Sequence, residues 1–338
     1  MDVNERLRDD LIRHAIYAER YSDAQLREII KVLKAVVKDV EKRIASEPNV
    51  VTLAWLKQNK AWIEQQAEIF TSKLDNGLKQ SIKDLITHEG ELFTRDMKRA
   101  ISVKFNYTIP APEVIERAVL SMPVDSGHLF EELMKRYDQL TKDYVISEIR
   151  AGIISGEGTK EMVHRLSGDA SLLSIQAASA ERMVRSVVMH TMNTARLELY
   201  KANRDVIKSV QYVATLDTKT CPVCGTLDGK TWDLDEQHPN PPMHYNCRCV
   251  LVPITKSWRE LGIDKDEIPP SVRSSMNGYV PETMDYTEWL AKQSEKTQAE
   301  ILGPTRLKMY KQGLPIEKMV RNGKPLTIEE LRQKEFFD

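Results

Sequence analysis

The sequence of 338 residues lacks features that mark several large classes of proteins. No apolar run reaches the roughly eighteen residues that a bilayer-spanning helix needs, so we expect a soluble protein without membrane contact. Neither sign of charge is in excess, since 49 lysines and arginines stand against 50 aspartates and glutamates. A chain that mainly gripped nucleic acid through its phosphates would be basic, so any DNA contact is expected to be local or incidental.

Glycine and proline are sparse before about residue 220 and frequent after it. This asymmetry predicts a helical N-terminal part and a C-terminal part that is rich in loops. Cysteine is scarcer still, and all four cysteines lie between Cys221 and Cys249. No signal-peptide pattern opens the sequence, so we expect the thiols to stay reduced and not to form two disulfides.

The stretch from Cys221 to Cys249 has the spacing of a metal site. Cys221 and Cys224 are two residues apart, and a tight turn between them would point both sulfurs the same way. A His-x-x-Cys-x-Cys motif at the end completes the candidate ligands of one zinc ion, which are Cys221, Cys224, His244, Cys247 and Cys249. Zinc normally takes four ligands, and the choice between His244 and Cys249 stays open.

Other roles for these thiols fit the pattern less well. A redox Cys-x-x-Cys pair stands at a helix start after a strand, whereas Pro222 and Gly225 favour a knuckle between two strands. A catalytic zinc keeps one open position, whereas more than three thiolates favour a closed site. The sequence therefore predicts a structural Zn²⁺ and no catalytic residues.

Apolar residues at helical spacing predict two long helices in the front of the chain. One pattern consists of Leu26, Ile30, Leu33, Val37, Val40 and Ile44, and the other of Leu53, Leu56, Ile63, Phe70, Leu74, Leu78, Ile82, Leu85 and Leu92. They are expected to form a long antiparallel hairpin, as an arm that docks on a larger assembly or as part of an ordinary bundle. Central helices are expected near residues 129–150, 159–166 and 175–203.

The region around the cysteines is expected to form a short antiparallel sheet. Its strands are predicted at residues 206–215, 230–232 and 249–254, with a hairpin turn at Asp228-Gly229. Behind Pro253, short helices are expected at residues 286–293, 298–302, 305–311 and 328–334. The aromatic residues Trp258, Trp289 and Tyr310 suit a tail that drapes over a neighbouring surface, or peripheral helices on the same domain.

The predicted fold class is therefore mainly α with a small α+β module stapled by zinc. A long N-terminal helical hairpin, central helices, a short antiparallel sheet with a zinc knuckle and C-terminal short helices follow one another. The expected domains are a helical arm at 1–120, a core with the zinc knuckle at 121–255, and a tail of short helices at 256–338.

Several stretches resemble the phage Mu F-like minor head proteins, also called phage head morphogenesis proteins. The similar stretches are Leu216 to Cys224, Leu227 to Lys230, Pro241 to Cys249, Ile301 to Arg306 and Gly323 to Leu331. The resemblance covers roughly residues 125–335, and its combined spacing is far more specific than one Cys-x-x-Cys motif. Tyr245 stands where the family often has proline, which affects no candidate ligand.

The resemblance implies a structural minor capsid protein of a tailed phage that is not an enzyme. It would assist head assembly, DNA packaging or genome delivery from the capsid interior at the portal vertex of the virion, after assembly in the host cytoplasm. The implied partners are the portal protein, with the major capsid or scaffolding protein as further candidates, and packaged DNA only incidentally. Composition and periodicity are compatible with this role but do not indicate it.

An enzyme is the competing interpretation. The sequence offers a superficial His-Asn-His pattern at His238, Asn240 and His244, as in a zinc-dependent nuclease or a toxin-like enzyme. This spacing is too compressed for a hairpin and a helix to present both a metal ion and a base. The pattern of cysteines therefore favours a structural role of this stretch over a catalytic one.

Overall fold

A computed structural model describes residues 3–47, 50–101, 105–124, 127–168, 171–266 and 272–333. These residues are mainly helical with small antiparallel sheets, as predicted. They divide into two compact units: unit 1 comprises residues 1–17, 87–115 and 192–338, and unit 2 comprises residues 18–86 and 116–191. In the described part of the chain, no helix combines the length and the apolar character that crossing a bilayer requires.

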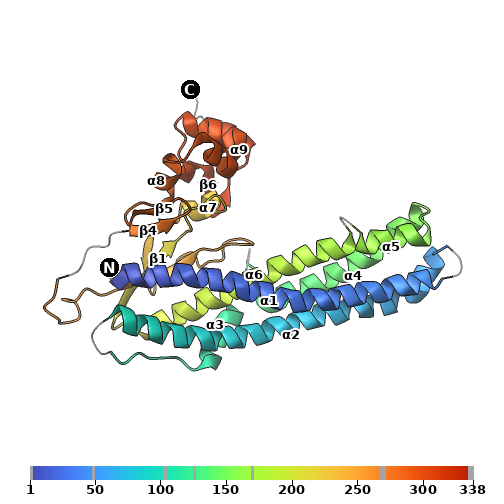
Figure 1. Cartoon of the computed structure of the whole chain (residues 1–338), viewed down its shortest axis with the longest axis horizontal. Helices are drawn as coiled ribbons and strands as arrows, with labels where there is room; N and C mark the ends of the chain where they lie inside the picture. Colours follow the sequence, from blue (N-terminus) through green and yellow to red (C-terminus); the bar gives the residue numbers. More distant parts are fainter. Residues whose placement is uncertain are drawn as a thin grey trace. The chain divides into compact units, whose positions relative to one another are not determined.

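Long helices dominate the front of the chain (Figure 1). In chain order they are α1 (Val3–Ala45), α2 (Leu53–Ala100), α3 (Pro112–Ser121), α4 (Phe130–Ile154), α5 (Thr159–Ser167) and α6 (Leu172–Ala202). The sequence pattern did not predict α3, which starts with a proline at a position where the missing N–H costs nothing. Helices α1, α2 and α6 contribute residues to both units.

In unit 2, α1 and α2 are antiparallel neighbours. Near the end of α1, Arg43 donates a hydrogen bond from Nε to Oδ1 of Asn59 near the start of α2, at 3.0 Å. Residues of the predicted seam are buried, namely Leu33, Val37, Val40 and Ile44. One turn earlier, Ile29 is the buried residue and Ile30 is only half-buried, because 3.6 residues per turn shift the seam along a helix of this length.

The core of unit 2 is shared by five helices. A cavity of about 10 Å³, at the lower limit for one water molecule, is lined by side chains of α1, α2, α4, α5 and α6. Its lining includes Val37, Phe70, Val145, Leu166 and Leu172. In this unit, α1 and α2 thus pack as members of a helical bundle.

Unit 1 contains a sheet of three antiparallel strands in the order β2-β1-β3. The strands are β1 (Ile207–Val213), β2 (Thr231–Asp233) and β3 (Val250–Thr255). Val210 pairs with Trp232 on one side of β1, and Tyr212 pairs with Leu251 on the other. All three strands lie where the sequence predicted them.

Side chains from helices fasten β3. Asn193 of α6 accepts a hydrogen bond at Oδ1 from the backbone N–H of Leu251, at 3.2 Å, and donates from Nδ2 to the carbonyl of Cys249, at 3.4 Å. At the other end of the strand, the N–H of Thr255 donates to Oδ1 of Asn4, at 3.0 Å. The first turn of α1 is therefore tied to the last residue of the sheet.

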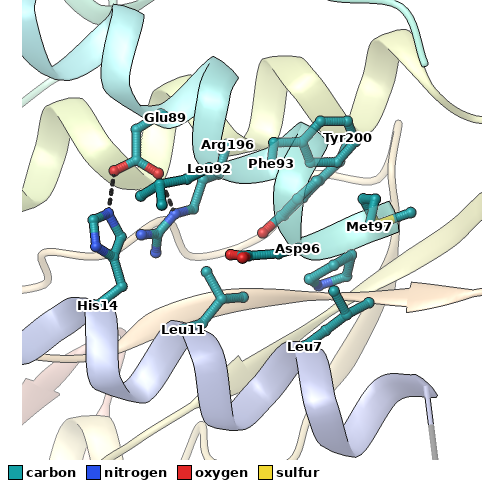
Figure 2. Close-up of a pocket in the computed structure, with 11 residues that line it drawn as sticks. Leu7, Leu11, His14, Glu89, Leu92, Phe93, Asp96, Met97, Arg196 and Tyr200 are labelled. Carbon is teal, nitrogen blue, oxygen red and sulfur yellow. Dashed lines mark hydrogen bonds and ion pairs between the residues drawn. The ribbon is translucent and has the colours of Figure 1, made fainter. Parts of the chain in front are cut away.

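A buried charge cluster joins α1, α2 and α6 within unit 1 (Figure 2). The carboxylate of Glu89 is 2.7 Å from Nε of Arg196 and 2.6 Å from Nε2 of His14. Burial lowers the pKa of His14, although its hydrogen bond with Glu89 acts in the opposite direction. The cluster lines a mostly apolar cavity of about 20 Å³, which has room for about one water molecule.

The tail folds into two small hairpins and short helices. Its elements are β4 (Val272–Ser275), β5 (Gly278–Pro281), α8 (Tyr286–Ala291), α9 (Glu295–Lys311), η1 (Ile316–Met319), β6 (Val320–Arg321), β7 (Lys324–Pro325) and α10 (Ile328–Gln333). Helix α9 bends at Gly303, whose φ is 73°, which accounts for the two helices predicted on either side. The predicted end of α10 at Lys334 lies outside the described residues.

The tail has a core of its own. Trp289 is only 1% exposed, and the apolar side chains that surround it include Tyr286, Leu302, Leu307 and Ile316. Trp258 is buried as well. These tryptophans therefore do not drape over a neighbouring surface, because their indole rings are already covered by this chain.

A buried ion pair connects the tail to the sheet module. Arg273 of β4 contacts Asp228 in the turn that leads into β2, with 2.9 Å between Nη1 and Oδ2, and both side chains are almost fully buried. The predicted hairpin at Asp228-Gly229 is wrong, because β2 pairs with β1 and residues 214–230 lie between these two strands. Asp228 also accepts from the N–H of Ala214 at 2.8 Å, and Arg273 donates to the carbonyl of Ala214 at 3.0 Å. Both oxygens of the carboxylate thus have a hydrogen-bond partner.

We expect Arg273→Met to lower the free energy of unfolding by about 3–5 kcal/mol, because it leaves the Asp228 carboxylate buried without its cation. Denaturant unfolding of the full chain measures the change. The control is Arg321→Met, which removes the exposed pair with Glu330 and should cost at most about 1 kcal/mol. Equal losses for the two variants would contradict this role of Arg273.

Candidate metal centre

The first half of the cysteine stretch forms a single helical turn after β1. This turn is α7 (Pro222–Gly225), with Cys221 as the residue before its start. Sγ of Cys221 accepts a hydrogen bond from the N–H of Cys224, at 3.4 Å, and the proline fits the first helical position. The predicted knuckle between two strands is thus wrong in detail, because Cys-x-x-Cys opens a short helix.

The second half returns through a loop that ends at β3. Cys249 directly precedes the first residue of that strand, so the sheet fixes its position. Asn246 has a φ of 60°, a left-handed conformation that asparagine tolerates better than most residues. The N–H of Cys247 donates to the carbonyl of His244, at 3.1 Å, which closes a tight turn around Asn246.

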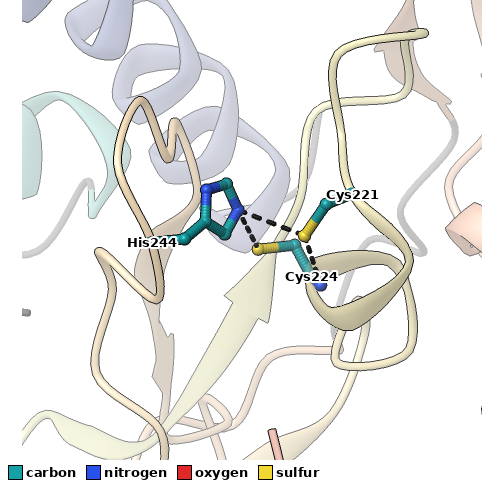
Figure 3. A group of neighbouring side chains, drawn as sticks. All are labelled: Cys221, Cys224 and His244. Carbon is teal, nitrogen blue, oxygen red and sulfur yellow. Dashed lines mark hydrogen bonds between the residues drawn. The ribbon is translucent and has the colours of Figure 1, made fainter. Parts of the chain in front are cut away.

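The structure brings the candidate ligands together (Figure 3). Nε2 of His244 lies 3.1 Å from Sγ of Cys221 and 3.3 Å from Sγ of Cys224. The sulfurs of Cys224 and Cys247 are 3.8 Å apart. Tetrahedral zinc would separate two thiolates by about 3.8 Å and a thiolate from an imidazole nitrogen by about 3.6 Å. The distance between the sulfurs matches such an ion, and the two sulfur–nitrogen distances are somewhat shorter.

Two overlapping groups of side chains could hold a metal ion. One consists of Cys221, Cys224 and His244, and the other of Cys224, Cys247 and Cys249, with the ligand atoms of each group within 4.8 Å of one another. Cys224 belongs to both. Which four of the five candidates bind one ion stays a prediction.

The imidazole of His244 has the orientation of a metal ligand. Nδ1 lies 2.8 Å from the carbonyl oxygen of Tyr245, which can only accept a hydrogen bond. Nδ1 therefore carries a proton, and Nε2 faces the sulfurs, where a bound metal ion would replace its proton. A backbone carbonyl that fixes the tautomer in this way is the usual outer partner of a metal-bound histidine.

Crowding of the thiols gives the cluster the electrostatics of a cation site. A hydrogen bond from the thiol of Cys224 is the main cause that lowers the pKa of Cys221, to about 5. The same contact is the main cause that raises the pKa of Cys224. Contact with Cys221 raises the pKa of His244 to about 9. Adjacent thiolates repel one another, and a divalent cation in their midst would stabilise all of them.

Residues outside the motif hold its two halves together. The guanidinium of Arg248 makes two hydrogen bonds of 2.7 Å to the carboxylate of Asp217, which joins the closing loop to the segment before Cys221. Tyr212 of β1 donates from its hydroxyl to Sγ of Cys224, at 3.4 Å. Motif spacing alone did not identify these three residues as parts of the site.

The tail supports the centre from the other side. The hydroxyl of Tyr286 donates to the carbonyls of Thr220, at 3.0 Å, and Asp217, at 3.3 Å. Its ring packs on Gly225 so closely that a Cβ there would lie 2.4 Å from Cδ1 of the ring. The glycine is thus needed for this approach of the tail to α7.

The His-Asn-His pattern is not assembled into a site. Nδ1 of His238 lies 3.1 Å from the carbonyl of Pro239, and Nδ2 of Asn240 donates to Oγ1 of Thr194, at 3.3 Å. His244 instead faces the sulfurs. Within the described ranges, neither group with metal-binding geometry includes His238.

Comparison with known proteins supports one family. Residues 143–252 match the family described as phage Mu protein F like protein. The match covers α6, β1, β2, the whole cysteine stretch and the first half of β3, which confirms the resemblance seen in the sequence over these residues. No curated protein and no solved structure matches this chain significantly.

We expect Gly225→Ala to lower the free energy of unfolding by about 1–3 kcal/mol, because the new methyl group would overlap the Tyr286 ring. Gly77→Ala is the control, since nothing lies within 4 Å of its Cβ position in the middle of α2. There alanine should be neutral or stabilise by up to about 1 kcal/mol. Thermal unfolding of both variants tests the contact, which is refuted if alanine is tolerated equally well at both positions.

Proposed function

Because residues 143–252 form a Mu F-like region, we propose that this protein is a minor structural component of a tailed-phage head, bound at the portal vertex. In this role it assists head assembly, DNA packaging or genome delivery. The match of the family over the metal-binding stretch is the observation that carries the proposal. The portal protein is the proposed main partner, and the major capsid or scaffolding protein are further candidates.

The proposed cofactor is one structural Zn²⁺. Thiolates and imidazole are the ligands that zinc prefers, and the five candidates offer enough of them to close a tetrahedral site without water. The ion would link α7 to the loop before β3. A sheet of three short strands buries too little apolar surface to hold such long loops in place by itself. A bound metal ion would therefore add stability that the apolar core does not provide.

An architectural role fits the surroundings of the centre better than catalysis. The most buried candidate ligands are Cys224, Cys247 and Cys249, each at most 3% exposed. A substrate would need an open coordination position and a base near it. The tail residue Tyr286 packs on one side of the cysteines and the sheet residue Tyr212 on another, while Cys221 and His244 are half-buried.

The purified full chain should contain about one zinc per molecule. Cys224→Ser should reduce zinc content most, because this residue belongs to both metal-capable groups. Comparison of His244→Ala with Cys249→Ala then identifies the fourth ligand by elemental analysis. His238→Ala is the control in the same loop and should keep its zinc. A metal-free protein with unchanged stability, or cysteines oxidised to disulfides, would refute the proposal of a structural zinc ion.

We expect the protein to co-purify with portal subunits of the phage that encodes it, and to be missing from heads assembled without a portal. Quantitative mass spectrometry of both kinds of head measures this. The control is the major capsid protein, whose amount should be the same in both. Equal amounts of the proposed minor protein in heads with and without a portal would rule out the portal vertex as its binding place.

A further inference from the structure

One exposed row of positions on α1 carries only basic residues and alanine along most of the part of this helix that lies in unit 2. Residues three or four positions apart lie on the same side of a helix, and from residue 20 to residue 45 this spacing selects one exposed row. The row consists of Arg20, Ala24, Arg27, Lys31, Lys34, Lys38, Lys42 and Ala45. We call its six cationic residues the basic ridge.

The basic ridge points away from the core. The buried seam of the same helix, which includes Leu33, Val37 and Val40, lies on the opposite side. The side chains of Lys31 and Lys42 are 70% and 66% exposed. From Arg20 to Lys42 the ridge is about 33 Å long at the helical rise of about 1.5 Å per residue.

Acidic residues of α1 lie beside the ridge but not on it. Several of them have a basic partner: Asp23 with Arg185 at 3.0 Å, Glu28 with Lys31 at 2.6 Å, and Asp39 with Lys42 at 3.1 Å. Four ridge cations form no ion pair within the described part of the chain, namely Arg20, Arg27, Lys34 and Lys38. In a protein whose net charge is −1, this is a strongly local concentration of positive charge.

The chemistry of the ridge favours a polyanion over a protein surface. The core of a protein interface is apolar and rich in aromatic residues, but the row offers no apolar side chain larger than alanine. Interfaces with nucleic acid are polar and positively charged. The length of the ridge is also close to that of one turn of B-form DNA, about 34 Å.

We propose that the basic ridge binds the phosphate backbone of duplex DNA without sequence preference. The proposal rests on the proposed function, because a head protein is exposed to packaged DNA, and it assigns that contact to named residues. A helix lying on the duplex can release counterions from several phosphates without reading any base. The near-zero net charge of the chain is compatible with this, because the cations are gathered on one row.

The test is fluorescence anisotropy of the full chain with a duplex of about 30 base pairs, from about 50 to about 200 mM sodium chloride. The variant Arg27→Gln/Lys34→Gln/Lys38→Gln removes three unpaired ridge cations. It should bind more weakly at every salt concentration, and the slope of log K against log salt should fall by about 2.7 in magnitude. A second duplex of different sequence should give the same result.

The control variant is Lys57→Gln/Lys60→Gln/Lys79→Gln, which removes the same charge from exposed positions of α2 in the same unit. It should bind DNA like the unmodified protein. Equal losses in both variants, or no DNA binding by the unmodified chain at about 50 mM salt, would overturn the proposal. Loss of portal association by the ridge variant with DNA binding intact would also overturn it, since the ridge would then be a protein contact.

Failure of the two proposals can be told apart. Ridge-dependent DNA binding by a protein that never associates with heads would leave the ridge assignment standing and refute the head function. Association with heads by a protein that does not bind DNA would support the head function and refute the ridge assignment. Circular dichroism of both variants should show unchanged helix content, because glutamine is a good helix former and all six positions are exposed.

Discussion

The architecture of unit 1 depends on the closure of two loops around one cluster of sulfurs and an imidazole. The sheet beneath them has only three short strands, so apolar burial alone holds these loops weakly. Polar contacts from outside the cluster compensate for this. The pair of Arg248 and Asp217 joins the loops to each other, and Asn193 of α6 joins the second loop and β3 to the helix behind the sheet.

The tail completes the same construction. Tyr286 donates to the backbone just before Cys221, and Arg273 neutralises Asp228 in the turn between α7 and β2. Both contacts place tail residues against the cysteine stretch, so the tail stabilises the centre as well as burying its own core. Architecture of this kind, with a candidate metal site supported by structural side chains, suits a component of a larger assembly.

Much of the fold could be predicted from the sequence because the relevant signals are local. Helical spacing in α1 and α6, strand alternation in β1 and the turn at Asp228 depend only on neighbours along the chain. The tail core could not be predicted, because Leu216 and Trp289 join one buried cluster only after the chain has folded. The spacing of the cysteines is also a local signal, so it indicated the candidate centre. Arg248, Tyr212 and Tyr286 belong to no sequence motif, so their contacts with the centre could not be predicted. The helical turn after Cys221 was not predicted, because proline and glycine fit a knuckle between strands as well as they fit a short helix.

The hydrogen bond between Asn4 and Thr255 has a consequence for the order of events on the ribosome. Unit 1 is assembled from three separate stretches of the chain, and its first stretch acquires this partner only when β3 has emerged. Contacts of such long range are slow to form. The contact of Asn4 with β3 therefore forms late in translation, while the bundle of unit 2, which ends at residue 191, is free to fold first.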